Sequence, residues 1–184
     1  MKNLLIIIVS SVVIFGFGYL LDRDSVPEFD ENAKLISHSF EMEIPNFKFE
    51  DLNKKEYSIS DFKGKVVMLN FWATWCGPCL EEFPELVNVL KTYKKDVVLV
   101  AISNDTNKKD IKKFLHKFKK EIESVKANII IGYDPNKDIS SSLFNILKLP
   151  ETFILNRSGK IIKKAVGAGQ WRDGNLLGFF TTII

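Results

Sequence analysis

Cys76 and Cys79 are the two cysteines of this 184-residue chain, and both lie in the segment NFWATWCGPC. A disulfide between such close neighbours closes too small a loop to stabilise the fold much, because the entropic gain grows with loop length. The spacing suits redox chemistry, in which one thiolate attacks a disulfide and the second thiol resolves the mixed disulfide. Inert core cysteines and half of a zinc site are the alternatives. Zinc takes four ligands, and the sequence holds no second cysteine or histidine pair.

The position of the two thiols at the start of a predicted helix gives them different roles. Free N–H groups and the positive end of the helix dipole favour an anion at Cys76, which lowers the pKa of its thiol. Cys79 lies one turn inside the helix, so we expect it to be more buried and to resolve the mixed disulfide. Gly77 allows close backbone approach, and Pro78 suits a first helical turn, where its missing N–H costs least.

Apolar patterning predicts the elements that position this motif. Strands are expected at 66–73, 96–103, 128–134, 151–156 and 160–166, and the last two form a hairpin. Helices are expected after Cys76, after a cap at Asp105 or Thr106, over a short segment at 136–147, and at the C-terminus. This alternation predicts an α/β fold with a mixed sheet flanked by helices.

Apolar side chains also predict which helix faces are buried. The stripe of the first helix is formed by Leu80, Phe83, Leu86, Val87 and Leu90. In the short helix, the inward side chains are expected to be Ile139, Leu143 and Ile146.

A β-hairpin is predicted at the start of the globular domain, near Ile44. Phe47 and Phe49 alternate with polar residues, a turn follows at 53–55, and the alternation then resumes. Ser60 is expected to cap a short turn after the hairpin.

Residues 1–21 are predicted to be a membrane anchor. The uncharged run 4–21 would span roughly 27 Å as a helix, which matches a bilayer core. Lys2 precedes this run, so the positive-inside rule places the rest of the chain outside the cytoplasm. A cleaved signal peptide ending near 16–18 is the alternative. We expect a polar linker at 22–43 and one domain at 44–184.

Composition argues against several other functions. The formal net charge of +3 is too small to indicate a nucleic-acid partner. His38 and His116 lie far from the cysteines in sequence, so no metal spacing results and no cofactor is expected.

The segment NFWATWCGPC resembles the active-site motif of thioredoxin-like thiol-disulfide oxidoreductases, and more closely their membrane-tethered TlpA/ResA/CcmG (DsbE) branch. The N-terminal anchor, the leading hairpin, EEFPEL after the motif and LPETFILNRSGKII carry the same resemblance, which covers residues 44–169. It implies a thioredoxin fold with an N-terminal β-hairpin extension and a transmembrane anchor.

The resemblance also implies roles for individual residues. Pro150 matches the cis-proline that faces the CxxC motif, and it would expose the backbone of Leu149 to a bound peptide. Trp75 is expected to shield the disulfide, whereas Trp72 packs in the core. The predicted substrate-contacting residues are Trp75, Gly77, Pro78 and Leu149.

Two positions depart from the related proteins. Asn70 stands where thioredoxin has a buried aspartate that helps to deprotonate the resolving cysteine. Another carboxylate would have to replace it, and Glu151 is the first candidate, with Glu82 second. Gly77 stands where ResA-like proteins have glutamate, so the chain differs from that subgroup at this position.

The sequence therefore predicts an extracytoplasmic protein-disulfide reductase at the cytoplasmic membrane. The WCGPC motif is that of the strongly reducing thioredoxin. The resemblance implies electrons from a CcdA/DsbD-type membrane protein and substrates such as apocytochrome c. A copper chaperone of similar fold is the alternative, because a pair of thiolates binds Cu(I).

Overall fold

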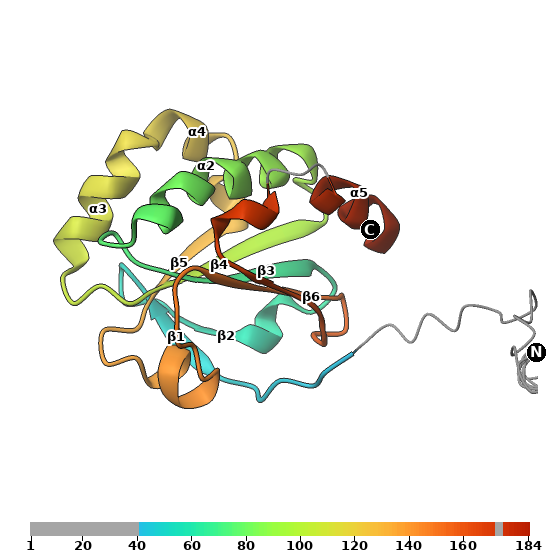
Figure 1. The fold of residues 1–184 in the computed structure, drawn as a ribbon, viewed down its shortest axis with the longest axis horizontal. Helices are drawn as coiled ribbons and strands as arrows, with labels where there is room; N and C mark the ends of the chain where they lie inside the picture. The colour runs from blue at the N-terminus through green and yellow to red at the C-terminus, as the bar shows by residue number, and fades with distance from the viewer. Residues whose placement is uncertain (1–40, 172–174) are drawn as a thin grey trace, which may run out of the picture. The chain divides into compact units, whose positions relative to one another are not determined.

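A computed structural model describes residues 41–171 and 175–184. One mixed sheet forms its centre, in the order β2-β1-β5-β4-β3-β6-β7 (Figure 1). The strands are β1 (Lys48–Asp51), β2 (Glu56–Ser58), β3 (Val66–Trp72), β4 (Val97–Ser103), β5 (Ile129–Tyr133), β6 (Glu151–Leu155) and β7 (Ile161–Val166). β3, β4 and β5 are parallel, and the remaining pairs are antiparallel. The predicted α/β fold and both hairpins are confirmed.

Helices cover one face of the sheet, as Figure 1 shows for α2 (Gly77–Thr92), α3 (Lys108–Lys117), α4 (Lys119–Glu123) and α5 (Asn175–Ile183). The other face packs against the 3-10 helix η1 (Ile59–Phe62) and the π-helix η3 (Asp138–Leu143), which is orange in the figure. Two short 3-10 helices, η2 (Lys126–Asn128) and η4 (Ala168–Trp171), complete the described elements.

Two hydrophobic clusters bury β3 from both sides. Successive side chains of a strand point to opposite faces, so Met68 and Trp72 join the cluster under α2 while Leu69 and Phe71 join the other. All residues of β3 and β4 are buried, as expected of central strands in a sheet covered on both faces. The active-site loop therefore begins from a rigid strand.

The apolar stripe predicted for α2 is confirmed. Phe83, Leu86, Val87 and Leu90 are buried against the sheet, and Leu80 is partly buried. The helix continues through Pro84, although proline lacks the N–H that would bond to the preceding turn.

Two predicted helix caps are wrong. Ser58, and not Ser60, precedes η1, and its backbone N–H donates to Asp61 Oδ2 at 2.8 Å. Asn107 caps α3 by accepting a hydrogen bond from the N–H of Lys109 at 2.9 Å. Asp105 is unavailable for that role because its carboxylate bonds elsewhere, as described below.

The predicted inward face of the short helix is correct for Ile146 and wrong for Leu143. Leu143 is 39% exposed, whereas Ile146 is 7% exposed. The expectation assumed about 3.6 residues per turn. Because η3 is a π-helix, its wider turns shift the side chains away from that spacing.

The predicted linker meets the domain before residue 43. Met42 and Ile161 form a bridge with backbone hydrogen bonds of 2.9 and 2.8 Å. The ammonium Nζ of Lys160 lies 3.4 Å from Glu41 Oε2 and 3.2 Å from Glu43 Oε1. The predicted anchor at 1–21 and nearly all of the linker lie outside the described residues. Within the described ranges, no helix is both long enough and apolar enough to cross a bilayer.

Candidate active site

Cys76 and Cys79 form a disulfide at the start of α2. Cys76 is the N-cap, and its Sγ accepts a hydrogen bond from the N–H of Cys79 at 3.3 Å. Cys76 is 7% exposed and Cys79 1%, which matches the expected order of access. A sulfur at an N-cap receives the N–H groups of the first turn, and these stabilise a thiolate after reduction.

Asp105 fixes the loop that leads into Cys76. Its carboxylate accepts hydrogen bonds from the Thr74 N–H at 2.9 Å, from Thr74 Oγ1 at 2.6 Å and from Ser103 Oγ at 2.7 Å. Asp105 is 3% exposed. These bonds join the end of β4 to the loop after β3. Sequence reasoning considered Asp105 only as a helix cap, because the contact depends on two strands lying side by side.

The Leu149–Pro150 peptide bond is cis, as the resemblance implied. Leu149 and Cys76 line the same surface hollow. The backbone N–H and C=O of Leu149 have no hydrogen-bonding partner within the part of the chain that the structure describes. An extended peptide in the hollow can therefore pair with them.

The two tryptophans beside the motif are placed as predicted. Trp75 is 64% exposed and lines the hollow together with Gly77 and Pro78. Trp72 is 1% exposed, with ring-centroid distances of 5.8 Å to Phe83 and 5.2 Å to Phe114. All four predicted substrate-contacting residues therefore border one cavity beside the disulfide.

Asn70 contacts a buried carboxylate. Its Nδ2 donates to Glu82 Oε1 at 2.7 Å and to Thr152 Oγ1 at 3.0 Å. Glu82 is 2% exposed and lies three residues after Cys79 on the buried face of α2. The sequence could have indicated the position of Glu82, because residues three apart share a helix face and the stripe predicted for α2 is apolar.

Glu151 lies on the other face of the sheet. It is paired with Phe71, whose side chain belongs to the cluster away from α2, and its Oε2 is 2.7 Å from Lys164 Nζ. Thr152, one residue later, faces Asn70 instead. This alternation reverses the expected ranking of the two carboxylates and makes Glu82 the better placed one.

Within the described ranges, no three His, Cys, Asp or Glu side chains gather into a group able to hold a metal ion. His116 lies on α3, and His38 lies outside the described residues.

Comparisons with known proteins agree with this geometry. A family model described as Redoxin matches residues 41–177. The thiol-disulfide oxidoreductase ResA of Bacillus subtilis (strain 168) is 38% identical over 126 residues, which are 68% of this chain and 66% of that protein. ResA of Bacillus anthracis is 33% identical over 128 residues, which are 68% of each chain.

Solved structures share the fold. A candidate thiol:disulfide interchange protein DsbE from Chlorobium tepidum has a TM-score of 0.66 and 27% identity, over 78% of this chain and 97% of the other. A thiol-disulfide oxidoreductase from Bacteroides fragilis NCTC 9343 has a TM-score of 0.57 and 27% identity, over 73% and 97%. The fold is thus the expected thioredoxin-like one. The chain belongs to the Redoxin family, as a thiol-disulfide oxidoreductase.

Proposed function

We propose that this protein is an extracytoplasmic, membrane-tethered reductase of disulfides in exported proteins. The observation that carries the proposal is the placement of Cys76 at the N-cap of α2, bordering a hollow that Leu149 also lines. A stabilised thiolate can attack there, while a peptide pairs with the neighbouring chain.

In the reducing direction, the Cys76 thiolate attacks one sulfur of a substrate disulfide and expels the other as a thiolate, which takes up a proton. The Cys79 thiol then loses its proton and attacks Cys76 in the mixed disulfide. The second substrate thiol leaves, and the Cys76–Cys79 disulfide results. Two electrons pass from the protein to the substrate.

We propose Glu82 as the group that accepts the proton of Cys79. It is buried on the same face of α2, and Asn70 orients it by donating to Oε1. Thr152 receives the second bond from Asn70 and thereby fixes the carboxamide. In this arrangement Asn70 acts through Glu82 and takes no part in proton transfer itself.

The cellular setting is part of the proposal. Residues 1–21 would anchor the protein in the cytoplasmic membrane as a single span, with the catalytic domain facing the periplasm or extracytoplasmic space. A CcdA/DsbD-type membrane protein would supply electrons, and apocytochrome c is a candidate substrate. The WCGPC motif and the ResA relatives support this reading.

The decisive experiment combines a rate with a potential. The reduced protein should reduce insulin, and Cys76→Ser should abolish the reaction, since the remaining thiol, Cys79, is buried. A copper chelator should leave the rate unchanged, whereas a copper chaperone would respond to it. The potential should lie near the value of about −270 mV of thioredoxin, and a value near the DsbA figure of about −120 mV would reverse the direction.

The substrate can be identified in cells. Cys79→Ser retains the attacking sulfur and removes the resolving one, so mixed disulfides at Cys76 should accumulate. Exported proteins among the captured partners would support the proposed compartment. Cytosolic partners alone would contradict it.

A further inference from the structure

The hollow beside the disulfide has a volume of about 530 Å³. It is lined by Cys76 at the N-cap of α2, by Asn104 directly after β4, and by residues of η3 and of the segment that leads to Leu149. Lys137 and Lys148 line it, and among the described residues no carboxylate does. Its ionisable lining, apart from the cysteine, is therefore positive.

Asn104 is a buried side chain with unused hydrogen-bonding capacity. Its backbone N–H donates to the carbonyl of Trp72 at 2.9 Å, and the residue is 6% exposed. Its Oδ1 is buried without a partner, and no bond to Nδ2 is found within the described ranges. A carboxamide both donates and accepts, so it complements the N–H and C=O of a peptide group. Buried groups of this kind normally have partners.

Lys137 and Lys148 carry charges that the described part of the chain leaves unpaired. Neither lysine forms an ion pair with a described residue, in contrast to Lys160 and Lys164. Lys137 also has a φ of 61° as the N-cap of η3, a left-handed conformation in which glycine or asparagine is usual. Two unopposed ammonium groups in a concave site attract an anion.

We propose that this hollow is a specificity site for an acidic residue beside the reactive cysteine of the substrate. The inference rests on the proposed function. Lys137 and Lys148 attract the acidic side chain, and Asn104 binds the backbone of the same segment. Cys76 then meets the substrate disulfide, and the redox step is the one described above.

Peptides can test the charge preference directly. We would react fully reduced protein with matched peptide disulfides that carry Glu, Gln or Lys beside the cysteine, and measure second-order rate constants. The Glu peptide should react about tenfold faster than the Gln peptide, and the Lys peptide slower still. Half-molar salt should shrink these differences. Equal rates for the three peptides would overturn the inference.

Variants assign the preference to the two lysines. Lys137→Asn removes a charge while suiting the left-handed backbone, and Lys148→Gln removes the other. The double variant should lose the preference for Glu. Lys54→Asn is the matched control, because Lys54 also has a left-handed φ, of 66°, in the β1–β2 turn. A preference that persists in the double variant, or disappears in Lys54→Asn, would contradict the assignment.

Asn104→Ala tests the backbone contact. The half-saturating peptide concentration should rise about tenfold, the order expected for loss of a hydrogen-bonding partner. The loss with the peptide should exceed by about tenfold any loss with 2-hydroxyethyl disulfide, which is neutral and has no peptide group. An equal loss with both disulfides would indicate a structural role and overturn the contact.

The two proposals fail differently. Wild-type protein that reduces 2-hydroxyethyl disulfide through Cys76 but does not discriminate between the peptides refutes the specificity site alone. Protein that reduces no disulfide refutes the proposed function.

Discussion

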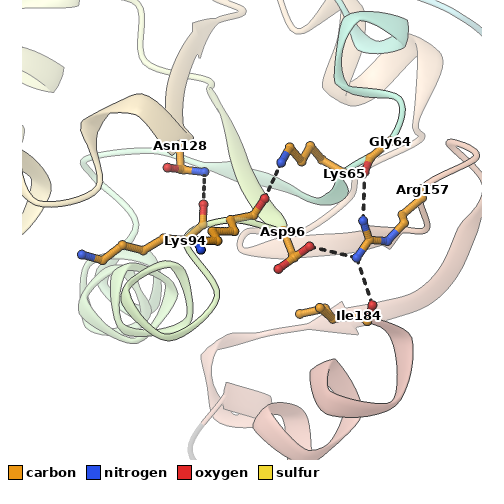
Figure 2. A network of polar contacts seen from close by, with 8 residues as sticks. Gly64, Lys65, Lys94, Asp96, Asn128, Arg157 and Ile184 are labelled. Carbon is orange, nitrogen blue, oxygen red and sulfur yellow. Dashed lines mark hydrogen bonds and ion pairs between the residues drawn. The ribbon is translucent and has the colours of Figure 1, made fainter.

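The parallel strands β3, β4 and β5 start at one side of the sheet, here called the amino edge, and end at the other, the carboxyl edge. The two edges differ in how their polar groups are bonded. At the amino edge, Arg157 donates to Asp96 Oδ1 at 2.9 Å, to the Ile184 carbonyl at 2.9 Å and to the Gly64 carbonyl at 3.3 Å (Figure 2). At the carboxyl edge, Asn104 Oδ1 beside the hollow is buried and has no partner among the described residues. Paired groups hold the amino edge together, whereas the carboxyl edge combines the bonded Asp105 with one unpaired carboxamide oxygen beside the hollow.

The remaining contacts in Figure 2 strengthen the amino edge. Asn128 donates to the carbonyl of Lys94 at 2.8 Å, and Lys65 donates to the carbonyl of Lys95. Outside the view of the figure, Asn128 also donates to the carbonyl of Val97 at 3.0 Å. These bonds connect the starts of β3, β4 and β5. Because stability and chemistry depend on different edges, substitutions at each should separate the two properties.

The largest effect among these predictions is expected at Glu82. Glu82→Gln should slow release of the mixed disulfide about 100-fold, since a positioned proton acceptor contributes about 10²- to 10⁴-fold. Stopped-flow measurement of the resolving step checks this. Glu151→Gln is the matched control on the other face of the sheet and should change the step by less than about twofold. Slowing in the control alone would restore Glu151 as the acceptor.

Asp105→Asn should reduce the reactivity of Cys76 about tenfold. The variant loses one of the two acceptor oxygens that hold Thr74 and Ser103, and a small displacement of a reacting group is costly. Alkylation of Cys76 in the reduced protein measures the effect. Asp110→Asn, at an exposed acid in the first turn of α3, should leave the rate unchanged. An unchanged rate in Asp105→Asn would remove it as a positioning residue.

Arg157→Met should lower the free energy of unfolding by about 1–2 kcal/mol and leave activity at 25 °C unchanged. Hydrogen bonds to charged groups contribute about 1.5–3 kcal/mol, and partial exposure of the pair reduces that figure. Denaturant unfolding and insulin reduction, measured together, provide the check. Arg157→Lys should recover only part of the loss, because it lacks the guanidinium fork. Loss of activity at full stability would disprove the separation of the two edges.

The smallest effect is expected at Lys160, also at the amino edge. Glu43 and then Glu41 raise the pKa of Lys160 above its ordinary value of 10.5. Because the pKa of Lys160 is raised in the folded protein, its charged form stabilises the fold fully below pH 10.5. This contribution is lost as the pH rises through the raised pKa. Lys160→Gln should therefore flatten the stability profile above pH 10.5, which thermal unfolding across pH can detect. A difference that grows toward acid pH would contradict the sign.

Local sequence patterns were sufficient to predict where the two reactive cysteines lie. An apolar run followed by WCGPC placed Cys76 at the N-cap of a helix and Cys79 inside it, because a strand end and a helix start depend on neighbouring residues. The opposite environments of Trp72 and Trp75, where β3 ends, were implied by the family resemblance.

Nonlocal pairing explains what the sequence could not indicate. Glu151 and Thr152 differ by one position, and the register of β6 against β3 decides which of them faces Asn70. Asp105 and Asn104 reach the site because β4 lies parallel to β3. The sequence contains both strands but does not state their order in the sheet.

The bridge between Met42 and Ile161 determines from which end the chain enters the domain. Ile161 pairs with Leu155, which pairs with Val67 near the start of β3. Cys76 follows the far end of that strand, roughly 20 Å away at about 3.3 Å per residue. The described chain therefore enters the domain near the starts of the central strands, and the disulfide lies beyond their other ends.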